Sequence, residues 1–265
     1  MSLRKSLRLP KEHGAWAMLY VPFVAGALVG ESFSLRLILL FLAITFFFVA
    51  RESLLAWWRA RRLGKPSGGV GAAAATYLGL ASLFGSPLIL YYELYWLAAP
   101  ALVGVALLAI NAEQGVRRQD RTASGEFMAI GGLTLTAPAA YYAGSGSWDI
   151  TALWLWALCA FYFASSVFYV KLRVYVLNPR KEQARRRMWR ASACYHLFLL
   201  ASLGALSTTG RLSLLAPVAF APALVRTFWF LLKPAGQLSL KRIGVLEIVY
   251  SVVFLIFIAL TFRPA

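Results

Sequence analysis

The sequence predicts an all-α protein: a polytopic membrane helical bundle of about nine transmembrane helices. Of its 265 residues, 60% are hydrophobic and only 14% are charged, too few to cover the surface of a soluble domain. The apolar residues come in runs of about 20, the length that an α-helix needs to cross a bilayer. Because basic loops are spread between these runs along the whole chain, we expect a single transmembrane domain over residues 1–265.

Nine apolar runs are bounded by charged or helix-breaking residues, and each is a predicted span. They are Gly14 to Gly30, Leu35 to Ala50, Val70 to Leu90, Leu94 to Ile110, Phe127 to Ala143, Ile150 to Val170, Ala191 to Ser207, Leu212 to Leu232 and Ile243 to Phe262. The basic N-terminal residues resemble the start of a signal peptide, but no small-residue cleavage site follows, so we expect the first run to remain as a helix. Cys159 and Cys194 lie inside apolar runs and are expected to be core residues.

The distribution of Lys and Arg predicts the orientation of the chain. Of the 27 basic residues, 23 lie in one alternating set of loops and 3 in the opposite set. Basic loops stay on the cytoplasmic side, so the N-terminus is predicted inside and, with nine spans, the C-terminus outside. A net charge of +17 in a soluble protein would indicate nucleic acid. Here the charge lies in membrane-flanking loops, so the expected partners are membrane lipids and no nucleic acid.

Ionisable side chains at or within the spans need a role, because each costs about 2.5 to 3.5 kcal/mol at the centre of a membrane helix. Nearly all of them lie at predicted cytoplasmic helix ends. The candidates for catalysis are Glu12, His13, Glu52, Glu113 and His196, and the candidates for substrate binding are Arg51, Asn111, Arg117, Arg121, Glu126, Lys171 and Arg173. Glu247 lies just over one turn inside the last span.

Three interpretations of these residues compete. The acids and arginines can form ion pairs that hold the bundle together at the level of the lipid head groups. The acids and histidines are metal-ligand types, but no His-Glu-x-x-His spacing is present, so the metal stays unknown. The arginines can converge on a phosphate or diphosphate, because the guanidinium fork binds phosphate through two hydrogen bonds. This anion site is the interpretation that we favour. The basic stretches 57–62 and 181–190 are predicted to lie on anionic lipid, with substrate capture as the alternative.

The segment Pro10-Lys-Glu-His-Gly-Ala-Trp-Ala-Met18, followed by Pro22 and Gly26, resembles the signature of the YwiC-like family of bacterial membrane proteins. Further matches are Arg51-Glu52-Ser-Leu-Leu-Ala-Trp57, Asn111-Ala-Glu113 and Arg121-Thr-Ala-Ser-Gly-Glu126. The resemblance implies a protein of the bacterial inner (cytoplasmic) membrane.

Nine spans and long cytoplasmic loops after the second and sixth also resemble the UbiA superfamily of prenyltransferases. That resemblance implies a UbiA-like fold in which a polyprenyl diphosphate is joined to an acceptor, with Mg²⁺ held by aspartate-rich motifs in the two loops. The loops here offer only Glu52 before Gly69, and Glu182. Mg²⁺ is therefore weakly supported and no catalytic residue is carried over.

Two functions follow as hypotheses. The first is a divergent UbiA-like transferase, or lipid-modifying enzyme, whose cytoplasmic-side cavity binds an isoprenoid or phospholipid-like molecule with an anionic head. In it, the acids and histidines would orient the arginines or act as acid and base. The second is a non-catalytic transporter or sensor of a small molecule, in which the same polar residues form a gate.

Overall fold

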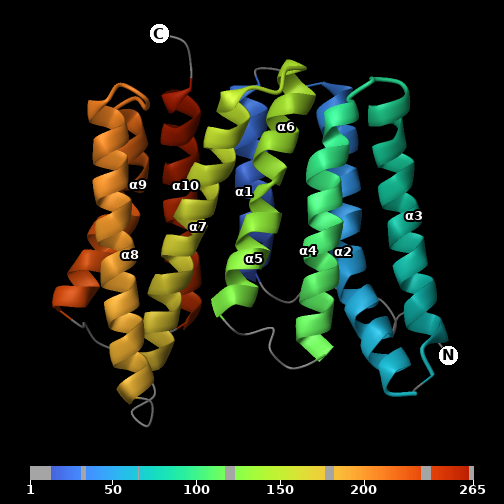
Figure 1. Ribbon diagram of the computed structural model, residues 1–265, viewed down its shortest axis with the longest axis horizontal. Coiled ribbons are helices and arrows are strands. Elements are labelled where there is room, and N and C mark those ends of the chain that lie inside the picture. The colour runs from blue at the N-terminus through green and yellow to red at the C-terminus, as the bar shows by residue number, and fades with distance from the viewer. Residues whose placement is uncertain are drawn as a thin grey trace. The chain divides into compact units, whose positions relative to one another are not determined.

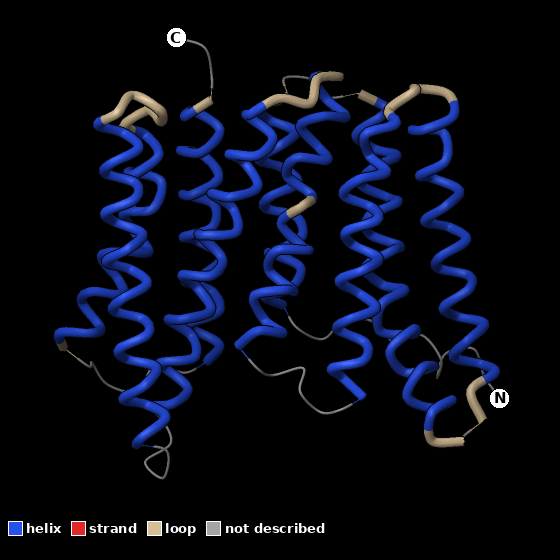
Figure 2. The backbone as a smooth tube through the Cα atoms, viewed as in Figure 1, coloured by secondary structure: helices blue, strands red, loops and turns tan. Residues whose placement is uncertain are grey.

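The computed structural model describes residues 13–30, 34–64, 66–116, 123–176, 182–233 and 240–262. Helices joined by short loops make up this part of the chain, and it contains no strand (Figure 2). The all-α prediction is therefore confirmed. The chain divides into two compact units, Met1–Trp156 and Ala157–Ala265, with the division inside one long helix. The single domain over residues 1–265 stays a prediction.

The first unit is built from helices that pack side by side in pairs (Figure 1). Its elements are α1 (His13–Val29), α2 (Leu35–Arg62), α3 (Gly68–Leu90), the 3-10 turn η2 (Tyr95–Leu97), α4 (Ala98–Val116), α5 (Ala123–Thr134), α6 (Thr136–Ser145) and the start of α7 (Ile150–Val176). Helix α2 packs along α3, and α1 packs along α6. Phe23, Leu40, Leu88 and Tyr142 are members of the buried apolar cluster that joins these helices.

Glycines allow α1 and α6 to approach until their backbones touch. A Cβ on Gly26 would overlap the carbonyl of Ala137, and one on Gly30 would lie 2.9 Å from the carbonyl oxygen of Tyr141. Gly144 lies against Gly30 from the opposite helix. Small residues spaced in this way bring membrane helices into close van der Waals contact, which compensates for the weak hydrophobic drive between helices in lipid.

The predicted span Phe127 to Ala143 is interrupted at Leu135, between α5 and α6 (Figure 2). Pro138 has no N–H for the carbonyl of Thr134, and its ring would clash with that carbonyl in a regular helix. One carbonyl next to the interruption is satisfied from another helix, because the indole of Trp156 on α7 donates to the carbonyl of Gly131 at 3.0 Å. Just after the interruption, the hydroxyl of Thr136 donates to the carbonyl of Leu19 on α1 at 2.8 Å, which ties the two helices together.

The second unit consists of the rest of α7 with α8 (Glu182–Thr208), α9 (Leu215–Leu232) and α10 (Leu240–Thr261). Helix α9 packs against both α8 and α10. At its centre the ring of Tyr162 stacks on Phe254, with 4.1 Å between ring centroids. Phe220 meets Phe254 edge to face. These rings are almost fully buried and form the apolar middle of the unit.

Six described helices are long and apolar enough to cross a membrane: α2, α3, α7, α8, α9 and α10. Two shorter apolar helical stretches, Gly14–Val29 and Tyr95–Leu107, coincide with other predicted spans. Nine spans therefore stay a prediction, although each predicted span falls on helix. Large apolar side chains such as Leu197, Phe198 and Val225 are exposed, as lipid-facing residues are. Cys159 is buried as predicted, but Cys194 is exposed, so its predicted place in the core was wrong.

Several helices continue beyond the apolar runs that predicted them. Helix α2 extends to Arg62, α7 extends to Val176, and α8 begins at Glu182, nine residues before the predicted span. All these extensions are basic and lie on the predicted cytoplasmic side. Uninterrupted helix-forming residues continue the backbone hydrogen bonds past the apolar part, so hydropathy alone underestimates helix length.

Candidate functional site

A buried histidine joins α7 to α8 in the second unit. His196 is fully buried, its Nε2 lies 2.9 Å from the hydroxyl of Ser165, and its Nδ1 lies 2.7 Å from the carbonyl oxygen of Ser192. A carbonyl can only accept, so Nδ1 carries a proton. In the neutral ring Nε2 is then the acceptor, and Ser165 donates to it. Both ring nitrogens are thus used, which a buried imidazole requires.

A buried ion pair joins α9 to α10. Nη1 of Arg226 donates to Oε1 of Glu247, and the side chains are only 7% and 16% exposed. The other polar atoms of the pair, Nε and Nη2 of Arg226 and Oε2 of Glu247, have no hydrogen-bond partner among the described residues. The buried hydroxyl of Ser166 also lacks one. Ionisable groups inside an apolar bundle are costly and mark functional positions.

Aromatic rings continue this polar cluster towards the ends of the helices. The guanidinium carbon of Arg226 lies 4.0 Å from the ring centroid of Tyr169. Arg173 is also buried; its Nε donates to the hydroxyl of Tyr169, and its guanidinium carbon lies 4.0 Å from the ring centroid of Phe230. Cation–π contacts of this kind stabilise a desolvated guanidinium by about 2 kcal/mol. The ring of Tyr169 therefore contacts two buried arginines, Arg173 and Arg226.

The spacing of residues along each helix explains this convergence. Tyr162, Ser165, Tyr169 and Arg173 follow one another on α7 at intervals of three or four residues, and so share one face of the helix. Arg226 and Phe230 have the same relation on α9. The cluster is thus a contiguous stripe on α7 that meets a stripe on α9.

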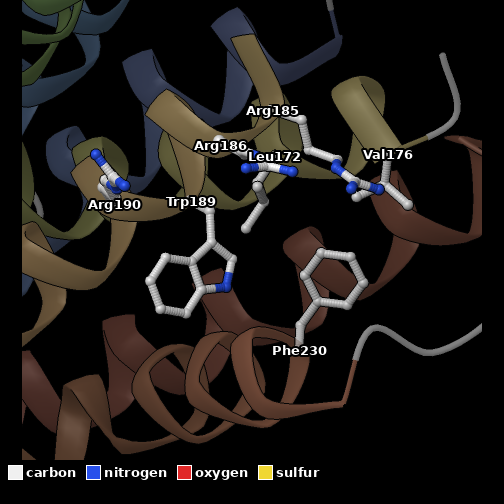
Figure 3. A pocket seen from close by; sticks show the side chains of 7 residues that line it. All are labelled: Leu172, Val176, Arg185, Arg186, Trp189, Arg190 and Phe230. Carbon is white, nitrogen blue, oxygen red and sulfur yellow. The ribbon is translucent and has the colours of Figure 1, made fainter. Parts of the chain in front are cut away.

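A pocket lies next to this cluster, where α7, α8 and α9 have their predicted cytoplasmic ends. Its volume is about 380 Å³. Its lining residues are Leu172, Val176, Arg185, Arg186, Trp189, Arg190 and Phe230 (Figure 3). We call this cavity the arginine pocket. The indole N–H of Trp189 donates to the carbonyl of Leu231 at 3.3 Å, which ties α8 to the end of α9.

Positive charges outnumber negative charges around the arginine pocket. Arg186 forms an ion pair with Glu182 one turn earlier on α8, with 2.7 Å between Nη2 and Oε1. Glu182 also attracts Arg185 electrostatically, whereas Arg190 forms no ion pair among the residues that the structure describes. The pocket therefore combines an excess of positive charge with a wall of aromatic and aliphatic side chains.

Three sequence-predicted residues of the first unit, Arg51, Glu52 and Glu113, form ion pairs. Nη1 of Arg51 lies 2.8 Å from Oε1 of the adjacent Glu52. Glu113, on α4, pairs at 3.0 Å with Arg62 on α2. These contacts agree with the ion-pair interpretation for Glu52 and Glu113. The roles of both residues in catalysis stay predictions.

For several other predicted residues, either the side chain or the whole residue is outside the part of the chain that the structure describes. Glu12, Arg117 and Arg121 fall outside the described residues. His13 begins α1 and Asn111 lies on α4, but their side chains are not described. The remaining two, Glu126 on α5 and Lys171 on α7, are half-buried. Of the twelve predicted site residues, only His196 and Arg173 lie in the buried polar cluster of the second unit.

Sequence reasoning left Arg226 and Ser165 out of the candidate site, although a signal for Arg226 was present. Arginine in the run Ala-Leu-Val-Arg226-Thr-Phe stands inside an apolar span, and Glu247 stands inside another. Each must be paired or solvated there, so the two were candidate partners. Ser165 carried no such signal, because serine is common in membrane helices. Among the described residues, no three His, Cys, Asp or Glu side chains lie close enough to hold a metal ion.

Apolar helices of membrane-spanning length, an apolar exposed surface and buried charges between helices define a polytopic helical membrane protein. The chain belongs to the family of YwiC-like proteins, whose sequence profile matches residues 9–141. The family prediction is thus confirmed. The matched residues all lie in the first unit, whereas the buried cluster and the arginine pocket lie in the second.

Two relatives extend the similarity over nearly the whole chain. The uncharacterised protein YwiC of Bacillus subtilis (strain 168) is 30% identical over 252 residues, which cover 93% of this chain and 95% of the relative. An uncharacterised protein of Haemophilus influenzae is 24% identical over 252 residues, with 94% and 96% covered. No solved structure matches the chain, so the UbiA-like fold stays a prediction.

Proposed function

We propose that the protein binds an anionic amphiphile, a lipid or isoprenoid-type molecule with a phosphate head, in the arginine pocket. The observation that carries this proposal is that three arginines and two aromatic rings line the same cavity. They are Arg185, Arg186, Arg190, Trp189 and Phe230. Guanidinium groups bind phosphate oxygens through charge-assisted hydrogen bonds. Aromatic rings next to them supply a surface for an apolar chain.

The size of the cavity suits the head and the first part of the chain of such a molecule. At about 380 Å³ it is near the lower end of small-molecule sites, which span about 300 to 1,000 Å³. A longer hydrocarbon tail would continue along the exposed apolar side chains of the bundle and remain in contact with lipid. The pocket is therefore suited to a ligand that stays in the membrane.

Sidedness favours a ligand of the inner leaflet. We propose that the N-terminus is cytoplasmic and that the protein lies in the bacterial inner membrane, because the basic loops alternate with nearly neutral ones. The pocket then opens at the head groups of the cytoplasmic leaflet. Arginines on a surface helix bind anionic lipid there in any case, and the cavity adds a defined place for one molecule.

Binding is better supported than catalysis. A general acid or base needs a carboxyl group that is not committed to a structural partner, whereas Glu52, Glu113 and Glu182 each form an ion pair with an arginine. A transferase reaction at this site stays a prediction.

Mass spectrometry of co-purifying lipids tests the proposal. The full-length protein and a triple variant, Arg185→Ala, Arg186→Ala and Arg190→Ala, are purified in a mild detergent, and their bound lipids are extracted and identified. We expect a phosphate-headed amphiphile in the wild type and at least a tenfold loss in the variant. The mass identifies the molecule as a phospholipid or an isoprenoid phosphate.

A control variant with the same loss of charge separates the pocket from general attraction to anionic lipid. Arg59→Ala, Arg61→Ala and Arg187→Ala remove three exposed arginines from the predicted cytoplasmic side, and none of them lines the pocket. We expect this variant to keep the bound amphiphile. Equal losses in the two variants, or no loss in either, would refute the pocket as the binding site. Thermal unfolding of each variant confirms that it is folded.

A further inference from the structure

The second unit contains a buried guanidinium group with one edge unused. Arg226 pairs with Glu247 through Nη1 alone. Its Nε and Nη2 have no hydrogen-bond partner among the described residues. The side chain is nevertheless 93% buried, with 7% of its surface exposed. A buried, unsatisfied donor costs about 1 to 3 kcal/mol, and more when it is charged. A ligand whose oxygens accept hydrogen bonds from these two donors would remove this cost.

The two unused nitrogens lie on the same edge of the planar guanidinium group. Their N–H bonds are nearly parallel and match the two oxygens of a carboxylate or the two oxygens on one edge of a phosphate. The rings of Tyr169 and Tyr250 lie next to the group, with centroids 4.0 and 5.1 Å from the guanidinium carbon. These cation–π contacts help to hold the group in place, and its Nε–Nη2 edge has no hydrogen-bond partner among the described residues.

A second positive charge lies close to Arg226. The guanidinium groups of Arg226 and Arg173 both contact the ring of Tyr169. An anion bound at Arg226 would therefore interact favourably with two guanidinium groups inside an apolar bundle. The buried hydroxyl of Ser166 lies in the same cluster, close enough to Glu247 to interact with it, and provides a further donor.

We propose that the Nε–Nη2 edge of Arg226 is a binding site for an oxyanion, either the carboxylate or the phosphate group of a small ligand. Arg226 lies six residues before the end of α9, or about 9 Å along the helix axis. It is one turn further into the helix than Phe230, which lines the arginine pocket. The site is thus distinct from the arginine pocket and does not depend on the proposed function.

Thermal unfolding of the purified full-length protein tests the site. Sodium acetate and sodium phosphate are titrated separately against sodium chloride at equal ionic strength. We expect acetate, phosphate or both to raise the Tm in a saturable manner, because a ligand that binds only the folded state stabilises it. The anion that acts identifies the ligand chemistry. No rise beyond that in chloride with either anion overturns the proposal.

Matched variants locate the effect. Arg226→Lys keeps the positive charge but removes the fork, so we expect it to lose the saturable rise, whereas Arg211→Lys, an exposed arginine, keeps it. The triple variant of the arginine pocket should also keep it. If the rise persists in Arg226→Lys and disappears in the triple variant, the anion binds in the arginine pocket and the present proposal is wrong. The lipid proposal is unaffected by either outcome.

A second variant keeps the test decisive if Arg226→Lys does not fold. Glu247→Gln retains the size of the side chain and removes the negative charge that competes with the ligand. We expect it to lower the half-saturating concentration of the active anion by about threefold or more, because the repulsion between two nearby anions is lost. An unchanged or higher half-saturating concentration contradicts binding at Arg226.

Discussion

The guanidinium group of Arg226 on α9 and the carboxylate of Glu247 on α10 form an ion pair that is largely buried inside the second unit. Both groups lie about two turns inside their helices, Arg226 six residues before the end of α9 and Glu247 seven residues after the start of α10. Their desolvation is compensated by the charge–charge attraction and by the rings of Tyr169 and Tyr250 on the guanidinium. The pair therefore fixes how α9 and α10 face each other.

Removing one partner of this pair should be far more damaging than replacing both. We expect Glu247→Ala to lower the free energy of unfolding by about 3 to 5 kcal/mol, because it leaves a buried guanidinium unpaired. The double change Arg226→Met and Glu247→Leu should recover most of this loss, since two apolar side chains need no partner. Thermal or denaturant unfolding in detergent measures both effects.

The exposed pair on α8 is the control. Glu182→Ala removes the partner of Arg186 at the surface, and such pairs contribute about 0 to 1 kcal/mol. If Glu247→Ala were no more destabilising than Glu182→Ala, the buried pair would have no structural role.

Gly26 should tolerate no larger side chain. We expect Gly26→Ala to destabilise the first unit by at least about 1 to 3 kcal/mol, because the new methyl group overlaps the backbone of Ala137 and the two helices must separate. Gly79→Ala on α3 is the matched control, since no atom lies within 4 Å of the added methyl group. It should be neutral or stabilising, because alanine is the better helix former by about 1 kcal/mol. Equal Tm values for the two variants would contradict the close packing of α1 and α6.

Asp149 caps α7 and should make stability depend on acid pH. Burial raises the pKa of its carboxyl, but hydrogen bonds from Tyr141, Thr151 and Ser147 outweigh this, so the pKa is lowered from 3.8. A carboxyl with a lowered pKa in the folded state stabilises the protein above its unfolded pKa. That contribution is lost as the pH falls through the folded value.

Two variants separate the charge of Asp149 from its role as a helix cap. Asp149→Asn keeps the cap, so the Tm difference between it and the wild type should shrink as the pH falls from about 6 to 3. Asp149→Ala should be less stable at neutral pH by about 1 kcal/mol, the usual cost of losing a cap. A pH-independent difference between wild type and Asp149→Asn would show that the charge contributes nothing.

The neutral form of His196 should carry its proton on Nδ1. The chain has only two histidines, so the ¹⁵N-histidine NMR spectrum of the protein in detergent contains two imidazoles, and His13→Gln assigns them. We expect Nδ1 of His196 to be protonated and Nε2 to be an acceptor. Ser165→Ala should shift the Nε2 resonance and cost about 1 to 3 kcal/mol, because a buried acceptor loses its partner. A proton on Nε2 of the neutral ring would show that the hydrogen bonds are assigned the wrong way round.

The candidate site was predicted from the sequence only in part. His196 and Arg173 were predicted because ionisable groups near apolar runs are costly, and both lie in the buried cluster. The basic segment 181–190 was predicted to lie on lipid, with substrate capture as the alternative, and the first of these stays a prediction. Arg185, Arg186 and Arg190 line a cavity, because α8 begins early enough for them to project towards α7 and α9. Hydropathy does not predict how far a helix continues beyond its apolar residues.

The sequence by itself determined the class of protein, the places of the helices along the chain and the predicted orientation. These depend on run length, on end signals and on the distribution of basic residues, which are local properties. Only the tertiary structure decided which charges meet. The pairing of Arg226 with Glu247 and of Arg62 with Glu113 depends on the rotation of each helix and on which helices are neighbours. These are set by packing between residues 21 and 51 positions apart in the chain.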